Sequence, residues 1–327
     1  MLRIIEDERD IRRCQQQMMR HFKPYLSGRL TVKLGHAGGS FAARIAWHAS
    51  PGIWLYSRKL PEGRYWNVFG LGLPEGSSAL PITCEINVPV AGVDRKLGGA
   101  FARHRDGRTF VVHRGLIGGA KKGVGKSLFA SRFRGVWSAL EEGRTVTPVA
   151  VIGELSSPRF VRHLSLFVLK IDRLKNLAVA SPQLEMPFET VSFREEWIGR
   201  AVTETDGAGG LACDHGPIVQ DLAAALRARG LRVGNDDRRD LLITDGGGRI
   251  GWILQVIPDS SERAVFDGVA RLLIYGADLP NGCRRVLVLP DGADKPHTER
   301  LKKLQVDLLP FAWDENRAVF PDLAALL

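Results

Sequence analysis

Short segments rich in β-branched and aromatic residues fill the chain from Leu30 to about Leu155 and are cut by Gly, Pro and Asp-Gly turns. Such segments predict strands, and their regular spacing is typical of a β-barrel or β-sandwich rather than of a βαβ repeat. In FARHRDGRTFVVH, the pair Asp106-Gly107 predicts a tight hairpin with a primed turn. The expected strands are LTVKL, FAARIAWHA, GIWLYSR, RYWNVFGL, PITCEINVPV, GAFARHR, TFVVHRGLI, SLFASRF and TPVAVIGEL.

Helical patterns flank this strand-rich region on both sides. Residues 4–22 combine helix formers with mixed charge, which predicts an amphipathic helix with a packing role. From Ser157 to Ala178 the apolar residues recur at helical spacing, which predicts a helix that closes the first domain. A polar stretch with Pro and a Gly-Ala-Gly-Gly tract follows. We therefore expect a first domain at 1–180, a linker at 181–212 and a second domain at 213–327.

The second domain alternates helical and strand-like segments. Its order is αββαβαβ, which predicts an α/β unit built on a small mixed sheet. The fold class expected for the whole chain is α+β with two domains. The segments are PIVQDLAAALRARG, RRDLLITD, IGWILQVIP, ERAVFDGVARLLIYGA, CRRVLVLPDG, HTERLKKLQ and VDLLPFAW.

Charge is divided unequally along the chain. Residues 1–180 hold 29 Lys and Arg against 13 Asp and Glu, whereas residues 181–327 hold 17 against 23. Lys and Arg that neutralise phosphates release counterions, which indicates a polyanionic partner for the first domain. We expect nucleic acid, with DNA ahead of RNA, and a protein partner for the acidic second domain. The alternative is a basic surface that is only solvated.

The densest cluster of Gly and basic residues is VVHRGLIGGAKKGVGKSLFASRFRG, residues 111–135. A P-loop would need Gly at position 120, which is Ala, and a strand-rich context also argues against an ATPase. We expect instead that the glycines let backbone N–H groups approach a phosphate inside a basic face. The residues expected on this face are Arg103, Arg105, Arg108, His113, Arg114, Lys121, Lys122, Lys126, Arg132 and Arg134.

Several features bound the remaining possibilities. The four cysteines are far apart and form no metal-ligand pattern, which indicates buried, reduced thiols. No long apolar run and no signal peptide is seen, so we expect a soluble, cytoplasmic protein without a membrane partner. The strand aromatics Trp54, Tyr56, Tyr65 and Trp66 could stack on bases, although a core position is the more common outcome for such residues.

The second domain resembles the PD-(D/E)XK nuclease superfamily, and its RecB-like branch in particular, over roughly residues 216–315. In GNDDRRDLLITD, Asp240 opens a strand; ILQVIPD follows with Gln255 and Ile257; RLLIY carries Arg271 and Tyr275. The resemblance implies that Asp240 is a Mg²⁺ ligand, that Gln255 and Ile257 replace the second carboxylate and the Lys, and that Tyr275 remains from the helix motif. An amide is a weak Mg²⁺ ligand and Ile carries no charge, so the implied catalytic site is degenerate.

Three functions remain open at this point. We favour a protein that binds nucleic acid without cleaving it, similar to components of prokaryotic restriction, antiviral defence or mobile-element systems. The first alternative is an active metal-dependent endonuclease, the only reading that requires Mg²⁺, with its acids relocated to Asp236, Asp237, Asp259 or Glu262. The second is a scaffold subunit of a nucleoprotein complex. A purely structural role for Asp240 and Gln255 is also open.

Overall fold

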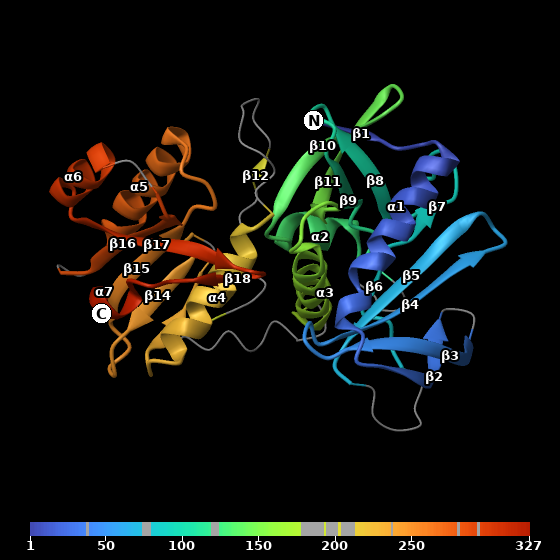
Figure 1. Ribbon diagram of the computed structural model, residues 1–327, viewed down its shortest axis with the longest axis horizontal. Coiled ribbons are helices and arrows are strands. Elements are labelled where there is room, and N and C mark those ends of the chain that lie inside the picture. The colour runs from blue at the N-terminus through green and yellow to red at the C-terminus, as the bar shows by residue number, and fades with distance from the viewer. Residues whose placement is uncertain are drawn as a thin grey trace. The chain divides into compact units, whose positions relative to one another are not determined.

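The computed structural model describes residues 1–36, 39–73, 80–118, 124–177, 193, 202–203, 213–236, 238–279, 282–292 and 295–327 (Figure 1). The chain divides into two compact units. The first comprises Met1–Pro182 and Ala201–Gly207, and the second comprises Gln183–Arg200 and Ala208–Leu327. Each unit has its own sheets and its own hydrophobic core. No helix among the described residues is long and apolar enough to cross a membrane.

Five strands of the first unit form a closed barrel. The ring closes because β1 pairs antiparallel with β8 and also parallel with β10, which completes the order β1-β8-β9-β11-β10. A sixth strand, β12, extends this sheet by pairing with β10, so part of the expected linker belongs to the first unit. The strands are β1 (Leu2–Ile4), β8 (Gly99–His104), β9 (Thr109–His113), β10 (Val136–Glu142), β11 (Thr145–Glu154) and β12 (Val202–Thr203).

A second antiparallel sheet lies in the same unit. Because side chains alternate across a strand, Ile53 and Phe69 face the main core, whereas Trp54 and Trp66 face a smaller cluster on the opposite side. Both tryptophans are therefore core residues. The strands are β2 (Gly28–His36), β3 (Gly39–His48), β4 (Ile53–Leu60), β5 (Arg64–Leu71) and β6 (Cys84–Glu85), and β7 (Val88–Pro89) pairs with β5.

Helices α1 (Glu8–His21), α2 (Lys126–Arg132) and α3 (Phe160–Leu177) complete the first unit, and the short 3-10 helix η1 (Lys23–Tyr25) follows α1. Asp7 caps α1, because its side chain accepts hydrogen bonds from the backbone N–H groups of Arg9 and Asp10. One face of α1 is buried in the main core through Ile11 and Met18. The helix expected over residues 4–22 is shorter, because Leu2–Ile4 form β1 and α1 begins at Glu8. The helical spacing expected for α3 is observed, since the apolar residues that define it are all buried in the main core: Phe160, Val161, Leu164, Phe167, Val168, Ile171 and Leu174.

The segment SLFASRF forms α2 and not a strand. Phe129 and Phe133 are one helical turn apart, and their rings stack with centroids 4.6 Å from each other. Both rings also contact Trp137 and Phe167 edge to face. Burial of this aromatic pair on a single helical face outweighs the strand propensity of the segment.

The β8–β9 hairpin has a longer loop than the expected primed turn. Arg103 and Thr109 are the last paired residues, and the backbone N–H of His104 donates to the carbonyl of Arg108. Gly107 adopts a φ of +91°, the left-handed conformation that closes a loop of this kind with a bulge.

The second unit contains one mixed sheet in the order β13-β14-β15-β16-β17-β18. β15, β16 and β17 are parallel, and the remaining pairs are antiparallel. Helix α5 packs on β15 and β16. The elements are α4 (His215–Arg227), β13 (Arg232–Gly234), β14 (Leu241–Thr244), β15 (Ile250–Val256), α5 (Glu262–Gly276), β16 (Arg284–Pro290), α6 (Lys295–Lys303), β17 (Val306–Asp314), β18 (Arg317–Val319) and α7 (Leu323–Leu326).

All four cysteines carry free thiols. Cys14 and Cys84 are buried, and desolvation raises the pKa of Cys14 to about 11 and that of Cys84 to about 12. Cys213 and Cys283 are half-buried. The expectation of complete burial therefore holds for the first pair only.

Candidate nucleic-acid interface

The β8–β9 hairpin carries Arg103, Arg105 and Arg108, three of the cations expected to bind phosphate. Arg103 Nη2 lies 3.2 Å from Asp10 Oδ2 of α1. Arg108 forms ion pairs with Asp106 at 2.8 Å and with Glu154 at 3.4 Å, and its guanidinium holds the pKa of Asp106 well below its ordinary value. Acidic partners therefore neutralise part of the positive charge of this hairpin.

His113 and Arg114 lie inside the protein and cannot belong to the expected basic face. His113 is fully buried; its Nδ1 accepts a hydrogen bond from the Gly115 N–H, and its Nε2 lies 3.1 Å from the Glu85 carbonyl. Desolvation lowers the pKa of His113 from 6.5 to about 4. Arg114 is buried against Glu142, with which it forms an ion pair. A buried cation of this kind is retained because its partner compensates the lost hydration.

The cations around α2 are divided between the surface and the interior. Lys170 of α3 is buried, its Nζ donates to the backbone carbonyl of Arg134 at 2.6 Å, and desolvation lowers its pKa from 10.5 to about 7. A count of charges along the sequence therefore exceeds the number of cations that a ligand can reach. Of the expected residues, Lys126 and Arg132 are exposed, Arg134 is half-buried, and Lys121 and Lys122 lie outside the described residues.

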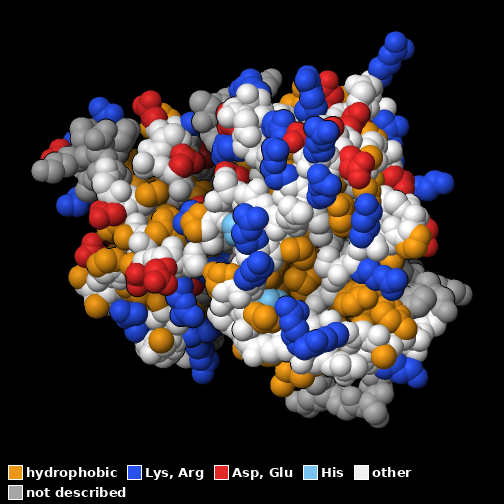
Figure 2. Space-filling view, turned by 45° about the vertical axis from the view of Figure 1, so that its right-hand side comes forward, with side chains coloured by type: hydrophobic (Ala, Val, Ile, Leu, Met, Phe, Trp, Pro, Cys, Tyr) orange, Lys and Arg blue, Asp and Glu red, His pale blue; other side chains and the backbone are white. Residues whose placement is uncertain are grey.

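Helix α1 presents a stripe of cations on the face opposite its buried residues. Between Ile11 and Lys23 the sequence contains no Asp or Glu. Figure 2 shows Lys and Arg side chains gathered over the part of the first unit that carries α1. The exposed cations of α1 and η1 are Arg9, Arg12, Arg13, Arg20 and Lys23. A helix expected only to pack thus contributes a large part of the basic surface.

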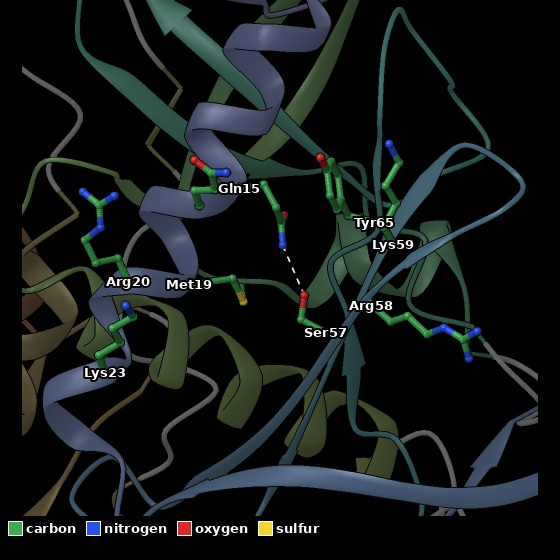
Figure 3. A pocket seen from close by; sticks show the side chains of 9 residues that line it. Gln15, Met19, Arg20, Lys23, Ser57, Arg58, Lys59 and Tyr65 are labelled. Carbon is green, nitrogen blue, oxygen red and sulfur yellow. Dashed lines mark hydrogen bonds between the residues drawn. The ribbon is translucent and has the colours of Figure 1, made fainter.

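A groove of about 390 Å³ lies between α1 and the β4–β5 hairpin (Figure 3). Cations stand on both of its sides. Its lining, within the part of the chain that the structure describes, contains four cations and no carboxylate. The residues that line it are Gln15, Gln16, Met19, Arg20 and Lys23 on the helix side, and Ser57, Arg58, Lys59 and Tyr65 on the hairpin side.

The pairing of β4 with β5 decides which side chains face the groove. Ser57 pairs with Asn67, and Lys59 pairs with Tyr65, so these four residues share the face that packs toward α1. Arg58 has the opposite parity, and in Figure 3 its side chain points away from the hollow. Tyr65 is half-buried. It is the strand aromatic that lines this groove.

A network of neutral polar groups forms the floor. Gln15 and Asn67 exchange two amide hydrogen bonds of 2.8 and 3.0 Å, and the Ser57 hydroxyl donates to Asn67 Oδ1 at 2.7 Å. Gln15 and Asn67 are both buried, and Asn67 also donates to the Ile86 carbonyl. These mutual bonds fix the floor in place and leave it uncharged.

The sequence contains a partial signal for this groove. The run IRRCQQQMMRHFK, residues 11–23, carries cations and amides without a single acid on a predicted helix. That pattern marks the outward face of α1. It does not reveal the hairpin side, because Ser57 and Gln15 are far apart in sequence and meet only through tertiary packing.

In the second unit, Asp240 lies directly before β14 and is buried. Its Oδ2 accepts hydrogen bonds from the Gln255 side-chain amide and from the Val256 backbone N–H, the latter at 2.8 Å, and lies 3.1 Å from His215 Nε2. Mg²⁺ prefers oxygen ligands, whereas Oδ2 of Asp240 is already bonded to nitrogen donors from Gln255 and Val256. This set does not fit Mg²⁺. His215, at the start of α4, was not among the expected residues.

The other residues implied by the nuclease resemblance do not complete a metal site. Tyr275 is half-buried in α5, and among the described residues no hydrogen bond joins it to Asp240. Ile257 is buried in the core of the second unit. Within the described residues, no group of three or more His, Cys, Asp or Glu could hold a metal ion.

The acids considered as replacements for the missing nuclease carboxylate have other local roles where the structure describes them. Asp236 accepts hydrogen bonds from the Arg239 backbone and side chain, and Asp259 accepts from Ser261, so both stabilise local turns. Glu262 occupies the first turn of α5. Asp237 lies outside the described residues.

Comparison with known proteins finds no family model that matches the chain, no match among curated proteins and no match among solved structures. Its function is therefore inferred from its own residues.

Proposed function

We propose that this protein binds nucleic acid through its first unit, with phosphates held by the cations of α1 and of the groove beside it. The observation that carries this proposal is the groove lining, in which Arg20, Lys23 and Lys59 occur without a carboxylate among the described residues, while Arg58 extends from its edge toward solvent. Cations that lack acidic neighbours are available to neutralise phosphates, and such contacts supply most of the affinity for a polynucleotide. Arg105 and Lys126 of the same unit are also exposed.

We further propose that the second unit is a nuclease-like domain that does not cleave. Two features support this. The amide of Gln255 donates to Asp240, where a second carboxylate would be needed to hold Mg²⁺. Ile257 offers neither charge nor proton to the reaction and is buried.

The binding proposal is tested with a triple variant, Arg20→Ala, Lys23→Ala and Lys59→Ala. We expect weaker binding to labelled DNA and RNA between about 50 and 200 mM salt. The slope of log K against log salt should fall by up to about 2 for single strands and up to about 3 for duplex DNA. Fluorescence anisotropy gives both quantities. Each lost phosphate contact removes the release of its counterions, which is the physical reason for the smaller slope.

The matched control is the triple variant Arg44→Ala, Lys96→Ala and Arg144→Ala. It removes the same charge from exposed positions that do not line the groove. We expect the wild-type slope for this control. Equal loss in both triple variants would contradict a localised interface, and an undiminished slope in the groove variant would contradict the proposal itself.

Cleavage is examined in the same mixtures by adding Mg²⁺ and separating the strands on a denaturing gel. We expect intact nucleic acid. Products that disappear with Asp240→Ala would contradict the proposal of a non-cleaving domain.

A further inference from the structure

In the groove beside α1, charged side chains lie at the edges and neutral side chains form the interior. Among the cations that line it, Arg20 and Lys23 lie on the helix side and Lys59 on the hairpin side. In Figure 3 the side chains of Arg20 and Lys23 point away from the gap that Met19 and Gln15 face, so their charges stand at the outer edge, or rim, of the groove. Its interior is formed by the Met19 thioether, the Tyr65 ring and the neutral polar floor at Gln15 and Ser57. A phosphate placed at the floor would gain no positive partner there. The interior therefore suits an uncharged, flat group better than an anion.

We infer that the groove receives one unstacked base of a single-stranded nucleic acid, while the phosphates on either side of that base contact the rim cations. This inference rests on the proposed nucleic-acid-binding function and specifies its substrate class. Three properties of the groove support it.

The first property is the pairing of an aromatic ring with neutral polar groups. Every base has a flat π face that stacks on an aromatic side chain, and Tyr65 lies in the groove wall. The Ser57 hydroxyl lies at the floor, donates to Asn67 and accepts from Gln15 Nε2 at 3.3 Å, which leaves one lone pair to accept a hydrogen bond from the edge of a base. Stacking with few base-specific hydrogen bonds predicts tolerance of sequence.

The second property is size. The groove is open to solvent, and its volume of about 390 Å³ is enough to accommodate one base that lies against its wall. A double helix keeps its bases stacked inside and presents phosphates outside, so it cannot insert a base without unpairing it. Single strands present their bases without that cost.

The third property is the position of the cations on opposite sides of the hollow. Arg20 and Lys23 belong to α1 and η1, whereas Lys59 belongs to β4. A mononucleotide carries its phosphate on one side of the base only. A chain that crosses the groove places phosphates on both sides, which matches this distribution of charge.

The test compares Tyr65→Leu with Tyr65→Phe. Ligands are labelled single-stranded DNA and RNA of about 12 nucleotides, within the site sizes of known single-strand binders, and the corresponding duplexes. We expect Tyr65→Phe to bind single strands as the wild type does and Tyr65→Leu to bind them about tenfold more weakly, because base–aromatic stacking is lost. The salt slope should remain unchanged, since no charge is removed. Circular dichroism establishes that both variants are folded.

A second measurement needs no variant. An abasic sugar-phosphate chain of the same length should bind the wild type more weakly than the normal single strand, although it carries the same charge. A mononucleotide should compete poorly with the strand.

The outcomes separate the inference from the function on which it rests. Equal affinity for single strand, duplex and abasic chain, with a steep salt slope, would overturn the base pocket and leave nucleic-acid binding intact. Absence of binding to every ligand at low salt would overturn both. Wild-type affinity of Tyr65→Leu for single strands would overturn the role of the ring.

Discussion

The ring of His113 is enclosed in the main core of the first unit, where it contacts Phe129 and Phe167, and hydrogen bonds fix its protonation state. Its Nδ1 accepts from Gly115, so the proton sits on Nε2, which faces the Glu85 carbonyl. Space around the ring is also restricted, because a Cβ at Gly98 would lie 2.7 Å from Nε2. A second proton on Nδ1 would face the Gly115 N–H, which is itself a donor and cannot accept a hydrogen bond.

This arrangement predicts acid sensitivity. The pKa of His113 falls from 6.5 to about 4 on folding, so the unfolded chain binds a proton in this window and the folded chain does not. The contribution of neutral His113 is complete above pH 6.5, declines as pH falls, and is lost below about pH 4. At pH 5 the loss corresponds to about 2 kcal/mol.

Urea unfolding of the wild type and of His113→Gln at pH 7 and pH 5 measures this effect. Glutamine does not titrate, so the variant should lose less free energy of unfolding than the wild type between the two pH values. An equal loss in both proteins would assign the acid sensitivity to other groups.

At the scale of elements, the N-terminal cap of α1 stabilises the helix that forms one side of the groove. Asp7 accepts hydrogen bonds of 2.9 and 3.0 Å from the backbone N–H groups of Arg9 and Asp10. Asp7→Ala should lower the free energy of unfolding of the first unit by about 1 kcal/mol, because two helix N–H groups lose their partner. Asp7→Asn retains a capping oxygen and serves as the control. Urea titration of both variants would contradict this role of Asp7 if alanine and asparagine gave equal stability.

Sequence patterns predict those elements whose side-chain alternation is visible within the segment itself. The strands β2 to β5 were predictable because alternation of apolar and polar residues is local information, read within each segment. Helix α2 was not, because its strand-forming residues become helical only when Phe129 and Phe133 stack on each other and meet Phe167. Strand β10 was missed, since VWSALEE offers no apolar alternation to mark it.

The candidate sites show the same limit. The pattern placed Asp240 at the start of one strand and Gln255 on the next, and the structure brings these two side chains into contact. His215, the third member, comes from a helix that precedes both strands. The groove depends on contact of Gln15 with Ser57 and Asn67, which no local pattern specifies.

At the scale of the whole molecule, the two units have separate sheets and separate cores. Chains of this kind unfold in more than one step when their domains are independent. We expect two calorimetric transitions. A single-stranded oligonucleotide should raise the midpoint temperature of the first unit's transition only, since a ligand stabilises the domain that binds it. The Asp7→Ala variant identifies which transition belongs to the first unit, because the substitution should lower the midpoint temperature of that transition only. If the oligonucleotide shifted only the other transition, the binding site would lie in the second unit and the proposal would be contradicted.

The closure of the barrel by β1 has a consequence for folding. Leu2 pairs with His104 on one side and with Leu140 on the other, so its partners are synthesised long after it. The ring cannot close while β10 is still missing, and the first residues of the chain must remain available until then. Pairing across such long stretches of sequence slows folding. We therefore expect this barrel to assemble late, when β10 joins a strand that lies far ahead of it in the sequence.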